Sequence, residues 1–143
     1  MTPAPVRLLE ETDSTNAEAR RLAEAGESGP LWIVARRQTA GRGRRGREWI
    51  DRTGNLSATL LTTMRRPPAE AAQLTFVAAL AVADLVDAFV PPSLVTIKWP
   101  NDILLAGDKV AGILIESGAH ADGGLWLAVG IGVNLARAPS GTD

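Results

Sequence analysis

The chain has 143 residues, and 45% of them are hydrophobic, which is enough for one domain with a buried core and excludes a disordered tail. Its formal net charge of −1 argues against a general nucleic-acid binder or a protein that binds membrane surfaces through charge. It has no cysteine and only one histidine, which excludes thiolate nucleophiles and zinc–cysteine sites and disfavours a Ser-His-Asp mechanism.

The predicted elements are short strands and two helices. In chain order they are a strand within residues 1–12, a helix over 17–25, strands at 31–35 and 55–64, a helix over 69–89, and strands at 95–99, 103–105, 110–116 and 125–135. Because the last strands follow one another directly after the long helix, this order predicts an α+β fold with a mixed, largely antiparallel sheet flanked by helices.

The two predicted helices carry signals at their ends and along one face. Thr15 and Glu18 fit a capping box at the start of the first helix, and Gly26 is a suitable stop. In the second helix, apolar residues recur at three- and four-residue spacing and are predicted to face the core: Leu74, Val77, Ala78, Ala81, Leu85 and Phe89. We expect this long helix to carry no chemistry of its own.

Residues 38–49 form a basic loop between two predicted strands. After Gln38, three glycines alternate with four arginines, and Trp49 closes the run. Glycine permits close backbone approach to a ligand, and arginine supplies a planar cationic fork suited to carboxylates and phosphates. The loop lacks both the Gly-Lys-Ser/Thr of a P-loop and the glycine spacing of a dinucleotide fingerprint. It therefore predicts either a wrap around an anionic small molecule or a solvated basic loop that contacts nucleic acid.

This loop is one of four sequence blocks that together resemble the signature blocks of biotin–protein ligases. The blocks are residues 41–49, 98–102, 109–116 and 130–135, and they occur in order over most of the chain. Ser14-Thr15-Asn16 and Gln38 match the biotin-pocket positions of that family. The resemblance implies that biotin is activated by ATP and Mg²⁺ to biotinyl-5′-AMP with release of pyrophosphate. The biotinyl group then passes to a lysine of a biotin carboxyl carrier domain, without any enzyme nucleophile.

The resemblance also implies roles for individual residues. The biotin-binding set is Ser14, Thr15, Asn16 and Gln38 around the ring system, with Arg42, Gly43, Arg44 and Lys109 around the acyl-phosphate region. Within that set, Lys109 and Arg44 are implied to be catalytic, by neutralising the reacting anions. The ATP-binding set is Arg44, Arg47, Trp49, Lys98, Asn101, Asp102, Gly112 and Asn134, with Trp49 packing on adenine and no residue assigned directly to Mg²⁺. Asp102 is a candidate partner for a lysine or a metal ion, although it can also be a turn cap, and Gly112 can equally be a strand bulge.

Expectations for partners and domain extent follow from the same resemblance. Biotin, ATP and the carrier domain are expected partners, DNA and membranes are not, and exposed apolar surface is expected to favour self-association, including a homodimer. We expect a cytoplasmic location, because no signal sequence or apolar run of transmembrane length is evident. Residues 1–143 are expected to form a catalytic domain incomplete at its C-terminus, without an N-terminal DNA-binding domain or a C-terminal β-barrel domain. The alternative functions are a lipoate–protein ligase and an inactive biotin-binding module.

Overall fold

The structure is a computed structural model that describes residues 2–51 and 53–136. Its strands are β1 (Val6–Thr12), β2 (Leu31–Gln38), β3 (Leu56–Met64), β4 (Val95–Lys98), β5 (Asp102–Leu105), β6 (Asp108–Ala119) and β7 (Leu125–Val133). Its α-helices are α1 (Thr15–Glu24), α2 (Pro68–Ala71) and α3 (Leu74–Asp87), and two short 3₁₀ helices lie at Arg44–Gly46 and Pro92–Leu94.

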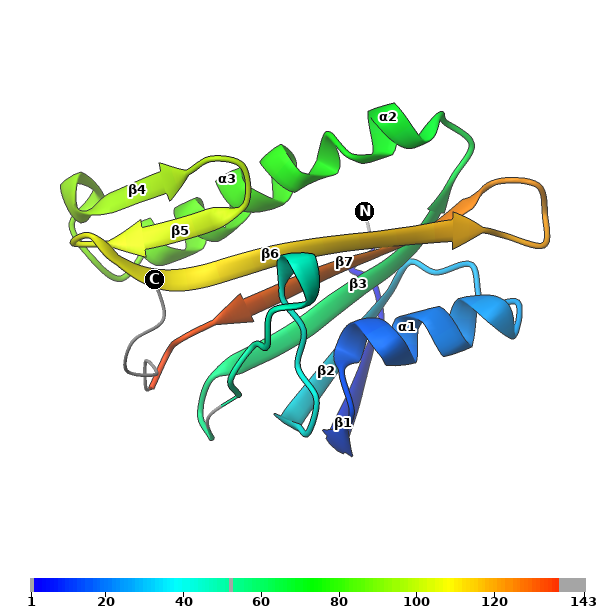
Figure 1. Ribbon diagram of the computed structural model, residues 1–143, viewed down its shortest axis with the longest axis horizontal. Coiled ribbons are helices and arrows are strands. Elements are labelled where there is room, and N and C mark those ends of the chain that lie inside the picture. The colour runs from blue at the N-terminus through cyan, green and yellow to red at the C-terminus, as the bar shows by residue number, and fades with distance from the viewer. Residues whose placement is uncertain (1, 52, 137–143) are drawn as a thin grey trace.

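Within the described part of the chain, the strands form one seven-stranded sheet in the order β1-β2-β3-β7-β6-β5-β4 (Figure 1). β1 runs parallel to β2 and is joined to it through α1, as a parallel pair requires a crossover. Every other neighbouring pair is antiparallel. The predicted α+β fold with a mixed, largely antiparallel sheet is therefore confirmed.

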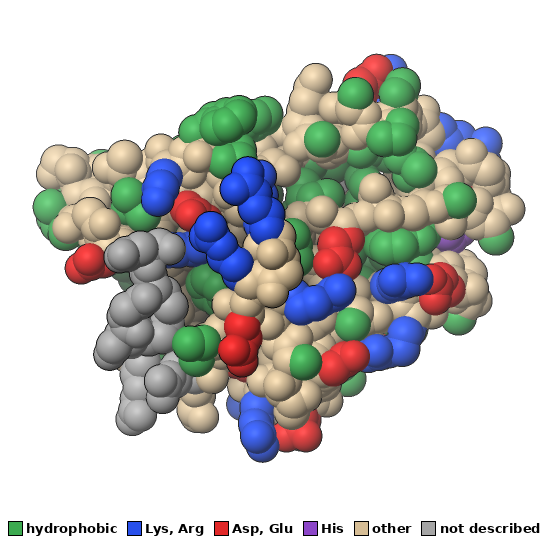
Figure 2. All heavy atoms as spheres, viewed as in Figure 1, with side chains coloured by type: hydrophobic (Ala, Val, Ile, Leu, Met, Phe, Trp, Pro, Cys, Tyr) green, Lys and Arg blue, Asp and Glu red, His purple; other side chains and the backbone are tan. Residues whose placement is uncertain are grey.

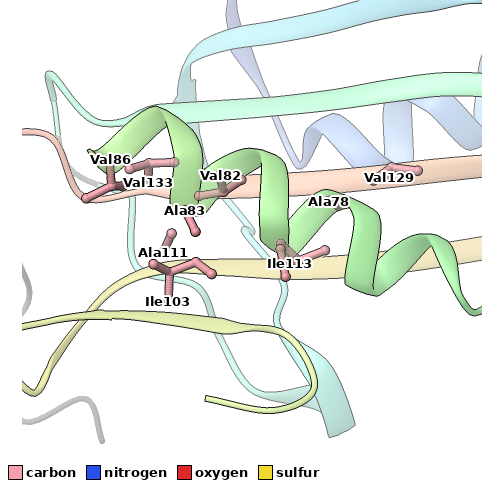
Figure 3. Close-up of a cluster of buried hydrophobic side chains, with 10 residues drawn as sticks. Ala78, Val82, Ala83, Val86, Ile103, Ala111, Ile113, Val129 and Val133 are labelled. Carbon is pink, nitrogen blue, oxygen red and sulfur yellow. The ribbon is translucent and has the colours of Figure 1, made fainter. Parts of the chain in front are cut away.

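α1 and α3 cover opposite faces of the sheet (Figure 1). Successive residues of a strand point to opposite sides, so a single strand contributes side chains to both faces. On β7, Ala128 belongs to the core beneath α1, whereas the next residue, Val129, belongs to the core beneath α3. Figure 3 shows the core beneath α3, in which Val82 and Val86 of α3 belong to one cluster with Val133 and Ile113 of the sheet. Each face thus has its own helix, and the α1 face is the one that carries the cleft described below.

The predicted long helix differs from the structure in two ways. It is interrupted at residues 72–73, so that α2 and α3 are separate. Apart from Ala78, its predicted buried face is wrong, because Val77, Leu85 and Phe89 are exposed. The buried positions are Ala78, Ala79, Val82, Ala83 and Val86. The helix is apolar on almost every side, and its small side chains allow the closest packing against the sheet, so spacing alone does not identify the buried face.

The stretch Pro68–Asp87 is long and apolar enough, by length and composition alone, to cross a membrane. The expectation that no apolar run reaches this length is therefore wrong. In the fold, the stretch is divided between α2 and α3, and one side of α3 packs on the sheet. A helix that forms part of a core passes the same composition test, so this feature is weak evidence for a membrane span.

We expect the outer side of α3 to drive self-association of this chain. Its exposed apolar residues are Phe76, Val77, Leu80 and Leu85, and the exposed Phe89 lies just past its end. Such surface tends to be buried by association. Sedimentation velocity should show oligomers whose fraction rises with concentration and falls when Val77 and Leu80 are both replaced by glutamate. A wild-type chain that stays monomeric at every concentration would contradict this expectation.

Candidate ligand-binding site

A cleft with a volume of about 720 Å³ lies on the α1 face of the sheet. Its walls are the start of α1, the end of β2, residues 42–50 and residues 99–102, and its floor is formed by β6 and β7. Figure 2 shows lysine and arginine side chains gathered near the middle of this face, around the loop that crosses the sheet. The cleft therefore has a basic rim in a chain whose net charge is slightly negative.

Glycines open the floor of the cleft. A Cβ atom on Gly130 would overlap the side-chain amide of Asn16, and one on Gly132 would lie 2.5 Å from the indole of Trp49. On the neighbouring strand, a Cβ atom on Gly112 would lie 3.1 Å from the same indole. These three glycines provide the space in which Asn16 and Trp49 are seated.

The N-cap of the first helix lies one residue before the predicted N-cap, Thr15. Ser14 is the N-cap, and its hydroxyl accepts a hydrogen bond of 3.0 Å from the backbone N–H of Ala17. Thr15 is the first helical residue, and the Glu18 carboxylate forms an ion pair with Arg21. The Thr15–Glu18 capping box is therefore wrong, because Ser14 already satisfies a free N–H group at this end. The Thr15 side chain therefore takes no part in capping and lines the cleft.

A neutral hydrogen-bond cluster ties the start of α1 to three strands. Gln38 Oε1 accepts a bond of 2.8 Å from the backbone N–H of Thr15. Asn16 Nδ2 donates to the carbonyl of Leu114 at 3.2 Å, and Asn16 Oδ1 accepts from the hydroxyl of Thr59 at 2.7 Å. Because Thr15 and Asn16 are 4% and 5% exposed, these bonds hold uncharged polar atoms in fixed positions at one end of the cleft.

Asp13 fixes the entry to this helix, and we expect its contribution to depend on pH. Its carboxylate accepts 2.8 Å bonds from Arg21 and from the backbone N–H of Ser14. The Arg21 guanidinium, more than any other group, holds the pKa of Asp13 well below its ordinary value of 3.8. The folded state therefore binds the proton more weakly than the unfolded chain does. The resulting stabilisation is present above that ordinary value and is lost as the pH falls below it.

Asp13→Asn should therefore lower the free energy of unfolding at about pH 7 by less than about 1 kcal/mol, because the pair is half-exposed. Urea unfolding should show this difference shrinking between about pH 4 and about pH 2. An equal difference at both ends of that range would show that charge is not its cause.

The basic loop is folded as a small hairpin over the cleft. The backbone N–H of Trp49 donates to the carbonyl of Gly41 at 2.9 Å, and that of Gly43 donates to the carbonyl of Arg47 at 2.7 Å. At the tip, Arg45 has a φ angle of 57°, in the left-handed region that few residues other than glycine adopt. The loop with the alternating glycines is therefore an ordered hairpin.

Two arginines anchor this hairpin to the rest of the site. Arg42 Nη2 forms an ion pair of 2.9 Å with Glu116 Oε2 on β6. Arg44 Nη1 donates to Asn101 Oδ1 at 2.9 Å, and Asn101 Nδ2 in turn donates to the carbonyl of Ile113 at 2.8 Å. Both arginines line the cleft and have protein partners, which favours the small-molecule interpretation of the loop over a nucleic-acid contact.

The opposite end of the cleft contains a confined lysine. Lys109 Nζ lies 3.2 Å from Asp102 Oδ1 and 5.6 Å from the centre of the Trp49 ring. The two charged side chains are 25% and 19% exposed, so the pair is partly shielded from water. Asn134 Nδ2 donates to the backbone carbonyl of Lys109 at 3.4 Å. A cation with a fixed position and a carboxylate partner is therefore available at this end.

The structure brings together all of the predicted site residues except Lys98. Lys98 ends β4 with an exposed side chain and is not among the residues that line the cleft. Asp102 is a lysine partner, as one of its two interpretations held. Gly112 pairs directly with Asp102, and the register shift lies between Ile103 and Leu104. The interpretation of Gly112 as a bulge is therefore wrong.

Sequence reasoning missed several residues that line the cleft. They are Arg45, Glu48, Ile50, Trp99, Pro100, Ile113, Leu114, Gly130, Ile131 and Gly132. All of them except Ile50 lie inside a recognised block and could have been included. Gly130 and Gly132 are two residues apart on a predicted strand, so period-two alternation places them on one face.

Among the described residues, no group of three or more His, Asp or Glu side chains is placed to hold a metal ion. The cleft does offer the Asp102 carboxylate and the amide of Asn134, whereas Asn101 Oδ1 accepts from Arg44. Mg²⁺ prefers oxygen ligands and is usually bound by one or two protein groups together with substrate phosphates. These residues therefore fit a Mg²⁺ ion that arrives with a nucleotide.

Comparison with known proteins gives a consistent result. Residues 8–135 match the biotin/lipoate A/B protein ligase family. The biotin–[acetyl-CoA-carboxylase] ligase of Paracoccus denitrificans is 56% identical over 133 residues, which are 92% of this chain and 55% of that protein. The solved biotin protein ligase of Leishmania major in complex with biotinyl-5-AMP matches with a TM-score of 0.78 and 33% identity, over 97% of this chain and 60% of that chain.

The biotin protein ligase of Aquifex aeolicus in complex with biotin and ATP matches with a TM-score of 0.72 and 35% identity. That match covers 95% of this chain and 55% of the Aquifex chain. The chain thus spans little more than half the length of these three relatives. It belongs to the biotin/lipoate A/B protein ligase family and has the fold of the biotin–protein ligase catalytic domain.

Proposed function

We propose that this cleft binds biotin and ATP, joins them as biotinyl-5′-AMP, and passes the biotinyl group to a lysine of a carrier domain. The order of uncharged and charged side chains along β6 and β7 is the main support for this proposal. Uncharged polar groups lie beside Leu114 and Gly130, whereas Lys109 and Arg44 lie towards Asp102 and its turn. That order fits a ligand with a neutral ureido ring at one end and a carboxylate at the other.

In the first step, a biotin carboxylate oxygen attacks the α-phosphorus of ATP, and the bond from that phosphorus to the pyrophosphate oxygen breaks. Two anions must approach each other, so the barrier falls when fixed cations lie beside them. Lys109 and Arg44 are the cations proposed here. Asp102 and Asn101 already orient them, so little reorganisation is needed when the ligands bind. Asp102 or Asn134 would hold a Mg²⁺ ion that arrives with the nucleotide, and the ion would neutralise further phosphate charge.

In the second step, the amine of the acceptor lysine attacks the acyl carbon, and AMP leaves. Positioning and charge neutralisation suffice for this transfer, which agrees with a chain that has no cysteine. The hairpin formed by the basic loop would keep water from the mixed anhydride before the acceptor arrives. Trp49 is proposed to pack on adenine, next to Gly112 and Gly132. The carrier domain and a cytoplasmic setting belong to the same proposal.

Pyrophosphate release is the direct test. ATP with biotin should release pyrophosphate in proportion to enzyme, whereas ATP with lipoate or with no acid should not. Equal release with lipoate would make the chain a lipoate–protein ligase. Calorimetric binding of biotin without pyrophosphate release would make it a biotin-binding module. Labelled biotin and an isolated carrier domain then test the transfer step.

A further inference from the structure

Thr59 is a buried polar residue behind the cleft whose side chain contacts two of the residues proposed to bind biotin. It lies in the middle of β3, is 0% exposed, and is not among the residues that line the cleft. Its Oγ1 lies 2.8 Å from Thr15 Oγ1 and 2.7 Å from Asn16 Oδ1. A buried hydroxyl needs such partners, so the contacts account for its burial. They also determine which groups of the cluster donate and which accept in each hydrogen bond.

The direction of each bond follows from counting hydrogens. A threonine hydroxyl has one hydrogen to donate and can also accept. Asn16 Nδ2 donates to the carbonyl of Leu114, so Asn16 Oδ1 is the atom that faces Thr59, and a carbonyl oxygen only accepts. The opposite amide orientation would place Asn16 Oδ1 against the Leu114 carbonyl oxygen. The hydrogen of Thr59 therefore goes to Asn16.

Thr59 must then accept at its 2.8 Å contact with Thr15, so the Thr15 hydroxyl donates its hydrogen to Thr59. The competing acceptor, Gln38 Oε1, is farther away at 3.2 Å and already accepts from the backbone N–H of Thr15. With its hydrogen committed, the Thr15 hydroxyl presents only lone pairs to the cleft. Ser14 is the opposite case, because its oxygen accepts from the Ala17 N–H and its own hydrogen stays available to donate.

This arrangement of one acceptor beside one donor matches a cyclic urea, which has ring N–H groups and a carbonyl oxygen. The dithiolane ring of lipoate has neither. We infer that Thr59 is a positioning residue that orients the hydroxyl of Thr15 as an acceptor, and that it thereby makes this end of the cleft selective for a ring that carries N–H groups. The inference rests on the proposed function and identifies a determinant of its substrate choice.

Thr59→Val removes the hydroxyl with little change in volume. Without Thr59, the hydrogen of Thr15 can turn to Gln38 Oε1 or towards the cleft, and Asn16 Oδ1 loses its donor. We expect the KM for biotin to rise about 10- to 100-fold, as expected when a buried partner is left unsatisfied. We expect kcat and the KM for ATP to change by less than about threefold, because the nucleotide end is not contacted. Selectivity for biotin over lipoate should fall by the same factor as the KM change.

Three further variants separate this role from a structural one. Thr59→Ser keeps the hydroxyl and should restore the KM for biotin to within about threefold. Thr63→Val makes the same chemical change on the same strand face, at a residue that does not line the cleft, and should leave the KM for biotin unchanged. Thr59→Ala removes the hydroxyl without adding a methyl group near Asn16, so it supplies the measurement if Thr59→Val does not fold.

The outcomes distinguish this inference from the proposed function. An active wild-type chain whose KM for biotin is unchanged in both Thr59→Val and Thr59→Ala overturns the inference alone. Equal losses in kcat and in both KM values, or failure of Thr59→Ser to restore the KM for biotin, assigns Thr59 a structural role and also overturns it. A wild-type chain that neither binds biotin in calorimetry nor releases pyrophosphate overturns the proposed function and, with it, the inference.

Discussion

Lys109→Ala is expected to slow formation of the adenylate by about 10²–10³-fold, the loss typical when one group aimed at a developing anion is removed. Lys109 is the one lysine that lines the cleft within the described residues. Its removal also leaves the Asp102 carboxylate, 19% exposed, without its cation beside the proposed phosphate position. Rapid-quench measurement of pyrophosphate release at saturating biotin and ATP would isolate the chemical step from binding.

Lys98→Ala is the matched control for this change, since it removes the same charge from the chain's other lysine. Lys98 is exposed and lies outside the cleft lining, so we expect an effect of less than about threefold. The double variant Lys109→Ala/Asp102→Asn should recover part of the lost rate by removing the uncompensated carboxylate. Near-normal release in Lys109→Ala would refute the role, and equal losses in both lysine variants would attribute the effect to long-range charge.

Much of the site could be predicted because its residues lie where the sequence is most informative. Ser14, Gln38 and Asn101 lie at the starts or ends of elements or in the connections between them, and the pattern located those boundaries to within a few residues. Gln38 closes a strand, and Asn101 follows a proline that ends another. Ligand contacts concentrate at such junctions on a rigid scaffold. The resemblance of the four blocks to those of biotin–protein ligases therefore identified most of the residues that line the cleft.

The buried face of α3 could not be predicted from spacing. Between Leu74 and Asp87 only Thr75 and Asp84 interrupt the apolar sequence, so every side of the helix satisfies a hydrophobic stripe. The fit of Ala78 and Ala79 against the sheet decides which side is buried. That fit depends on residues far away in the sequence, including Ile113.

Thr59 could not be recognised for a related reason. In the sequence it resembles Thr62 and Thr63 on the same strand, and threonine is common in strands. Its environment is created by α1, whose Thr15 is 44 positions away, and by the placement of β7 between β3 and β6. The position of the last strand at the centre of the sheet is a property of the whole chain, which local patterns do not encode.

Gly130→Ala is expected to weaken biotin binding by about 5- to 150-fold, the equivalent of the 1–3 kcal/mol that overpacking typically costs. The added Cβ atom would overlap Asn16 Oδ1. Asn16 cannot move aside without losing its bonds to Thr59 and Leu114, so the polar end of the cleft must distort. Calorimetry with biotin measures the effect, and thermal unfolding reports how much of it reflects general destabilisation.

Gly132→Ala provides the comparison, because it makes the same substitution two residues further along the same face of β7. Its Cβ atom would lie 2.5 Å from the Trp49 indole and would leave Asn16 untouched. Trp49 is proposed to pack on adenine, so Gly132→Ala should weaken ATP binding more than biotin binding, and Gly130→Ala should do the reverse. Equal losses for both ligands in both variants would show that the cleft does not separate a ring end from a nucleotide end. If Gly130→Ala mainly weakens biotin binding and Gly132→Ala mainly weakens ATP binding, the ring end and the nucleotide end of the cleft lie within two residues of one strand.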